Sequence, residues 1–129
     1  MVLANKIKYP HMRDELIEHL KALSNKDYQE SVWIRGEFPP GVVHDELDYV
    51  IHFIYDDTCL GKDPDAAIGW FLVREEEARS IRDLVCRLDS LFTKYGLNLT
   101  DEEYIEKSEW ADVVRAAEIS KNLLLSSDI

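Results

Sequence analysis

Apolar residues recur at steps of three and four along much of the chain, which is the spacing of an amphipathic helix. Residues 10–24 follow this spacing after Pro10, and a proline fits the first turn because the N–H it lacks would be unpaired there. A second such segment runs from Arg74: three glutamates that suit a helix start come first, apolar residues follow at the same spacing from Ile81 to Tyr95, and Gly96 suits a helix end. Both segments are predicted to be helices.

Two further helices are expected towards the C-terminus. Thr100 and Glu103 have the spacing of a capping box, and Ser108 can cap a helix that follows it. Together these patterns predict an all-α fold over residues 1–129, a compact single-domain bundle of about five or six helices. A minor strand pair is compatible with this prediction.

The stretch from His44 to Thr58, HDELDYVIHFIYDDT, fits two structures. Every second residue from Leu47 to Tyr55 is apolar, which favours a strand, as does the content of Val, Ile, Phe and Tyr. The stretch is longer than an average strand of about 5–6 residues, and Glu46 and Asp48 suit the first turn of a helix. A helix is the favoured interpretation, and a strand remains the alternative.

Three other segments are less regular. The segment RGEFPPGVV holds Pro39 and Pro40 between two glycines and is predicted to be a connecting loop, because proline fixes φ and lacks a donor. The preceding YQESVWI fits a short helix or a strand. DPDAAIGWFLV is predicted to be a short buried helix, with a strand as the alternative.

Composition and cysteine content narrow the class of protein. Apolar residues make up 46% and charged residues 32% of the chain, which excludes a disordered polymer. There is neither the run of roughly 20 apolar residues that a bilayer needs nor a signal-peptide pattern, so a cytoplasmic protein without membrane association is expected. Cys59 and Cys86 are expected to be reduced thiols.

Charge is distributed unevenly around a net value of −11. Residues 1–36 carry +1, residues 37–65 carry −7, residues 66–96 carry zero, and residues 97–129 carry −5. Such a field repels nucleic acid and anionic membranes, and it attracts basic proteins or metal cations. A role of the charge in solubility alone is the alternative.

Candidate chemistry is sparse. If residues 44–56 are helical, His44, Asp48, His52 and Asp56 lie at steps of four on one stripe and could bind zinc or iron. The same pattern is typical of the solvated face of an amphipathic helix, and that interpretation is favoured. The chain has no phosphate-binding glycine loop, nucleophile elbow or calcium-loop spacing. A protein without enzymatic activity and without a cofactor is therefore expected.

Tryptophans provide the remaining candidates. Trp70 and Trp110 are expected in the core, whereas Trp33, beside the proline-rich loop, is a candidate for a binding surface. The favoured hypothesis is a binding module that docks on a basic protein, and its competitors are a metal-assisted enzyme and a structural or oligomerisation domain. The candidate partner-binding residues are Trp33, Glu37, Asp48, His52, Asp56 and Asp57.

Four phrases, GEFPPG, LDYVIHFIYDDT, IGWFL and YIEKSEW followed by VV, resemble those of a family of small acidic bacterial proteins of unassigned function. The resemblance spans most of residues 30–117. It implies a bacterial, cytoplasmic, single-domain protein and brings no active site, cofactor or substrate. In size and acidity the chain is also similar to immunity proteins that neutralise toxins, which is a general analogy.

Overall fold

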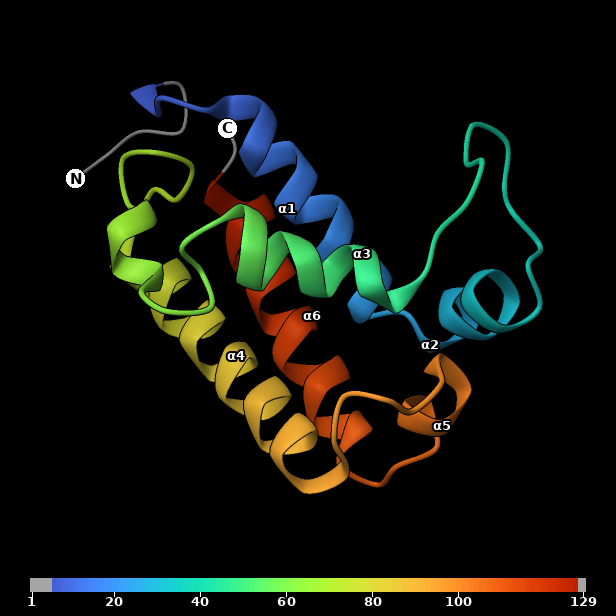
Figure 1. The fold of residues 1–129 in the computed structure, drawn as a ribbon. Coiled ribbons are helices and arrows are strands. Elements are labelled where there is room, and N and C mark those ends of the chain that lie inside the picture. Colours follow the sequence, from blue (N-terminus) through green and yellow to red (C-terminus); the bar gives the residue numbers. More distant parts are fainter. Residues whose placement is uncertain (1–5, 128–129) are drawn as a thin grey trace.

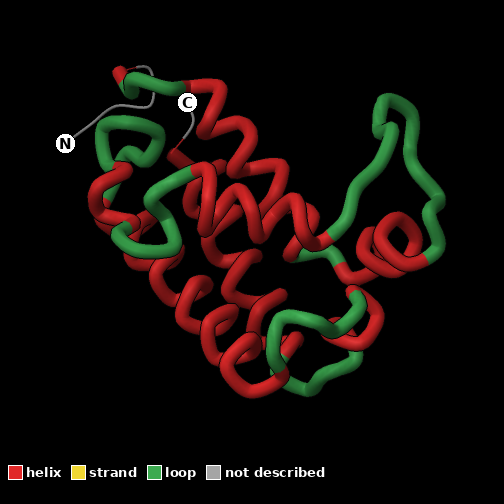
Figure 2. Tube along the Cα trace, viewed as in Figure 1, coloured by secondary structure: helices red, strands yellow, loops and turns green. Residues whose placement is uncertain are grey.

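Three long helices form the centre of the fold (Figure 1). The computed structural model describes residues 6–127, and within them α1 (Pro10–Leu23), α4 (Glu75–Tyr95) and α6 (Trp110–Ser127) pack side by side, with α6 against both α1 and α4. Figure 2 shows helices and loops only, and the predicted all-α fold is confirmed over this part of the chain. No helix among these residues has the length and apolar character needed to cross a bilayer.

The helix ends follow the local signals in most places. Pro10 lies in the first turn of α1, and Gly96 ends α4 with a φ of 82°, a conformation that favours glycine. Thr100 and Glu103 form the predicted capping box of α5 (Asp101–Ile105). Ser108 does not directly precede α6, which begins at Trp110; the Ser108 hydroxyl donates to the Glu109 carboxylate instead.

The ambiguous stretch after His44 is helical, as favoured. The α-helix α3 (Leu47–His52) continues as a π-helix, η3 (Phe53–Asp57), and crosses the face formed by α1 and α6 in Figure 1. Leu47, Val50, Phe53 and Ile54 are buried at helical spacing, whereas Tyr49, one of the alternate apolar positions, is exposed. Burial therefore follows the period of a helix and not that of a strand.

The segment YQESVWI, for which a short helix and a strand were both possible, is helical and includes a second π-helix after α1. Asn25 caps the short helix α2 (Lys26–Tyr28) by accepting from Tyr28 N, and η2 (Gln29–Ile34) continues it. The fully buried Gln29 amide donates to the carbonyls of Ala22 and Leu23 at 2.9 Å each and accepts from the Trp110 indole at 2.9 Å. These bonds satisfy the last carbonyls of α1, and the polar side chain thereby fits the core.

The segment DPDAAIGWFLV departs from its prediction. Only Pro64–Ala67 is helical, as the 3₁₀ turn η4, and an isolated bridge between Ile68 and Leu72 follows in place of a strand pair. Trp70 is 50% exposed, so its expected place in the core is wrong. Gly69, with a φ of 90°, turns the chain outward after η4 and positions Trp70 outside the bundle. Trp110 is buried as expected.

One ion pair crosses the interior. The Arg13 guanidinium on α1 binds both oxygens of Glu77 on α4, at 2.9 and 2.8 Å, and it donates to the carbonyls of Phe71 and Leu124. The Glu77 carboxylate also accepts from Val73 N at 2.8 Å. Burial alone would raise the pKa of Glu77, but the bonds from Arg13 and Val73 lower it below its usual value. This pair joins α1, α4, α6 and the segment before α4.

Candidate interaction surface

The two acidic segments of the sequence meet in space. Asp101 Oδ2, at the start of α5, accepts a hydrogen bond from Leu47 N, at the start of α3, at 3.1 Å. Glu46 and Asp48 flank Leu47, and Glu102 follows Asp101, so four carboxylates gather where these helices begin. We call Glu46, Asp48, Asp101 and Glu102 the acidic junction.

The acidic junction borders a pocket of about 370 Å³ between η2, α3 and α5. The other lining residues are Trp33, Ile34 and Thr100. Burial, and then the neighbouring carboxylates of Glu46, Asp48 and Asp45, raise the pKa of Asp101, and the bond from Leu47 N only partly offsets them. Like charges are therefore held close together here, and a bound cationic group would relieve their repulsion.

An apolar groove adjoins the acidic junction. It lies between α3, the end of α4 and α5, and it shares Asp48 and Asp101 with the acidic pocket. Its apolar lining residues are Leu47, Ile51, Phe92, Leu97, Leu99 and Tyr104. Leu97 is 74% exposed in the turn after α4. The lining of this groove is thus both apolar and polar, and two carboxylates of the acidic junction lie among its apolar side chains.

Trp33 does not have the exposed position expected of an anchor. It is only 9% exposed, lies edge-on to Trp110 with ring centroids 6.5 Å apart, and donates from Nε1 to Asp45 Oδ2 at 3.1 Å. Tyr28 donates to the same oxygen at 2.7 Å. The reason is that η2 directs this face towards α5 and α6, so Trp33 supports the surface from below.

The proposed metal stripe does not form along one helix. His44 precedes α3 and pairs with Glu46 at 2.8 Å, while His52 pairs with Asp56 at 2.6 Å. Among residues 6–127, no three or more histidine, cysteine, aspartate or glutamate side chains are arranged to hold a metal ion. The arrangement is two separate histidine–carboxylate pairs at the surface.

The other predicted site residues are dispersed. Asp48 lies in the acidic junction, whereas Glu37 pairs with Arg35 at 2.8 Å in the loop before α3. His52, Asp56 and Asp57 lie at the far end of α3 and in η3, outside the pocket lining. Sequence reasoning missed Asp101 and Glu102, although the charge of −5 over residues 97–129 pointed to that region.

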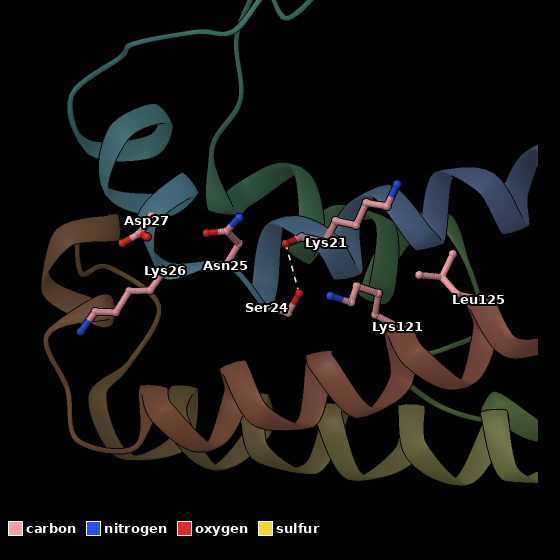
Figure 3. A pocket seen from close by; sticks show the side chains of 7 residues that line it. All are labelled: Lys21, Ser24, Asn25, Lys26, Asp27, Lys121 and Leu125. Carbon is pink, nitrogen blue, oxygen red and sulfur yellow. Dashed lines mark hydrogen bonds between the residues drawn. The ribbon is translucent and has the colours of Figure 1, made fainter.

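A second pocket, of about 470 Å³, lies between the end of α1, α2 and α6 (Figure 3). Its lining includes Lys21 from α1, Lys26 from α2 and Lys121 from α6. Figure 3 shows Lys21 and Lys26 extending away from one another, and the Lys21 amino group donates to Glu18 at 3.2 Å. The cations do not converge on a common point, so they form no anion site.

Comparison with known proteins gives one result. A family model described as a domain of unknown function, DUF7945, matches residues 7–129. The chain belongs to this family. No curated protein and no solved structure matches the chain. The match agrees with the resemblance to a family of unassigned function, and it covers all three long helices.

Proposed function

We propose that the protein is a non-catalytic binding module that docks on a basic protein through the acidic junction and the adjoining apolar groove. The observation that carries this proposal is the hydrogen bond from Leu47 N to Asp101, which brings the two acidic segments together beside a groove that six apolar residues help to line. Carboxylates so close to one another repel, and a lysine or arginine of a partner would compensate them.

The two parts of this surface have different roles in binding. The carboxylates speed association, because an acidic field attracts a basic partner before contact. The groove slows dissociation of the complex, because apolar burial and shape complementarity affect the dissociation rate more than the association rate. An immunity-type inhibitor in the bacterial cytoplasm is the specific form we propose, on the grounds of acidity, size and a surface suited to a basic protein.

The test compares two variants that lose the same charge. Asp48→Asn with Glu102→Gln changes the acidic junction at two side chains that make no hydrogen bond among the described residues. Asp14→Asn with Glu118→Gln is the control, on the exposed faces of α1 and α6. Proteins retained from an extract of the native host are quantified by mass spectrometry, and a retained protein is purified for kinetic measurement.

We expect the junction variant to lower the association rate about tenfold at low salt, and the control to lower it much less. The difference should vanish near 1 M salt, where the Debye length is about 3 Å. Thermal melts establish that both variants fold. Equal association rates for junction variant and control at every salt concentration would contradict the proposal and leave a structural or oligomerisation domain.

A further inference from the structure

We infer that the loop of residues 37–45, here called the proline loop, inserts into a concave apolar cleft of the partner. Lysine or arginine residues at the mouth of that cleft would face the acidic junction. This inference rests on the proposed function and specifies the shape of its partner. In Figures 1 and 2 the proline loop projects from the bundle between η2 and α3. Its residues Pro39 and Val42 line one side of a pocket of about 450 Å³, and α1 lines the other.

The base of the proline loop is fixed at both ends. At its start, Glu37 N donates to Ser31 O at 2.9 Å, and Gly36, with a φ of 69°, ends η2. At its end, Asp45 accepts from Tyr28 and Trp33 through one oxygen and from Glu46 N through the other. The buried Trp33 therefore holds the base of the proline loop against the bundle.

The tip of the proline loop is a tight turn. Val42 N donates to Pro39 O at 3.0 Å, with Pro40 and Gly41 between them, and Gly41 has a φ of 88°. Proline followed by glycine at positive φ is the sequence of a type II turn. Two prolines and a closed turn leave the tip few conformations, so little entropy is lost when it enters a cleft.

Two apolar side chains flank this turn. Val43 is 91% exposed, whereas Phe38 on the opposite arm is 37% exposed and packs on His44. The rings of Phe38 and His44 lie 5.4 Å apart, and those of His44 and Tyr49 lie 5.7 Å apart, which ties the two arms to each other and to α3. A β-branched side chain in water at the end of a fixed projection is suited to a pocket in another protein.

Charge complementarity identifies the chemistry of the cleft. The proline loop leads directly into Glu46 and Asp48, so a partner that surrounds the tip also meets the acidic junction. Acidic residues at the entrance of the partner's cleft would repel these carboxylates, and a neutral entrance would leave them unpaired. The tip itself carries no charge from Phe38 to Val43, so the interior of the cleft is apolar.

Photo-crosslinking tests the insertion directly. Val43 is replaced by p-benzoylphenylalanine in the full chain, and Ile119, an exposed residue of α6, is replaced in a matched control. Both proteins are illuminated in native extract, and crosslinked peptides are mapped on the partner by mass spectrometry. Competitors are the wild type, Gly41→Ala and Gly69→Ala. Both glycines have a φ near 90°, and a Cβ at either meets no atom within 4 Å, so each substitution places alanine at a positive φ without a steric clash, in a different turn.

We expect a dominant adduct at position 43, absent at position 119, with its partner residue inside a cleft bordered by lysine or arginine. Wild type and Gly69→Ala should suppress this adduct equally, and Gly41→Ala should be about a tenfold weaker competitor because alanine disfavours the left-handed turn. A missing adduct, an equal adduct at position 119, a crosslink on a convex face, or equal competition by Gly41→Ala would overturn the inference.

Failure of the inference differs from failure of the proposed function. If Asp48→Asn with Glu102→Gln still slows association while no adduct forms at position 43, the acidic junction docks without insertion of the proline loop. If the charge variants associate equally, the proposed function itself fails, whatever the crosslinking shows.

Discussion

Glu77 and Asp101 are both acidic residues near a helix start, but their environments are opposite. Glu77 is fully buried, and Arg13 and Val73 N compensate its charge so well that its pKa is lowered. Asp101 is partly exposed and lies among other carboxylates. Partial burial raises its pKa, and the neighbouring negative charges raise it further. The Glu77 carboxylate is compensated within the chain, whereas Asp101 has one backbone donor and several acidic neighbours. The difference distinguishes a carboxylate that stabilises the fold from one that belongs to the proposed binding surface.

The largest effect should come from breaking the compensated pair. Arg13→Met leaves the Glu77 carboxylate buried without its cation, and we expect it to lower the free energy of unfolding by about 3–5 kcal/mol. Urea denaturation followed by circular dichroism measures the change. Arg13→Met combined with Glu77→Leu should recover much of the loss, since no buried charge then remains. A loss below about 1 kcal/mol for the single variant would show that the pair is not needed.

Glu77→Gln should cost less, about 1.5–3 kcal/mol at pH 7, because the amide oxygen can still accept from Arg13 or Val73 N while the charge is lost. A lowered pKa in the folded state means that the stability contributed by Glu77 is present above the usual value of 4.5 and is lost as the pH falls through the folded value. The gap between wild type and variant should therefore narrow in acid. Unfolding curves from pH 7 to pH 3 measure it, and a constant gap would contradict the assigned pKa direction.

Asp101→Asn should change the free energy of unfolding in the opposite direction, and by less. Its side-chain oxygen can still accept from Leu47 N, and the repulsion from neighbouring carboxylates is removed, so we expect stabilisation of a few tenths of a kcal/mol at pH 7 after allowing for solvent screening. Because the pKa of Asp101 is raised in the folded state, wild type gains stability as the pH falls towards 3.8, the usual pKa of an aspartate. The difference in stability between wild type and Asp101→Asn should therefore disappear near that pH. Glu103→Gln, on an exposed acidic residue whose pKa is lowered, is a control without this gain. Destabilisation by Asp101→Asn at pH 7 would show that the charge is required for the bond to Leu47.

The smallest effect should come from the exposed pair on α3. His52→Ala removes the contact with Asp56, and both side chains are more than half exposed, so the free energy of unfolding should change by less than about 0.5 kcal/mol. Addition of zinc should not shift the melting temperature of wild type relative to this variant. A zinc-dependent shift that His52→Ala removes would restore the metal hypothesis.

The sequence predicted those features that depend on neighbours along the chain. Pro10, Gly96 and the Thr100–Glu103 box determine helix ends through local hydrogen bonds, and the apolar spacing of α1 and α4 follows from one buried face per helix. Of the three glutamates at the start of α4, Glu77 lies four positions before Ile81 and so falls on the buried face of the helix. The spacing does not show its cation, because Arg13 is 64 positions away in the sequence.

The candidate site was harder to predict for the same reason. Trp70, expected in the core, is exposed, and Trp33, a candidate for a binding surface, is buried. Each is positioned by contacts beyond its own segment, because η2 packs against α5 and Gly69 O accepts a hydrogen bond from Lys8 N. The acidic junction depends on the meeting of α3 and α5, and the bond between Leu47 and Asp101 spans 54 positions. The net charge of each segment could be counted, but no periodicity could show that they meet.

The contacts of Arg13 also constrain the order in which the protein assembles. The bond from Arg13 to Leu124 O spans 111 positions, and α1 packs against α6. At about 5–20 residues per second, the ribosome makes α6 roughly 5–20 s after α1. Throughout that interval the nascent α1 lacks the helix against which it packs. The bundle therefore closes only after α6 has been made and has left the ribosome.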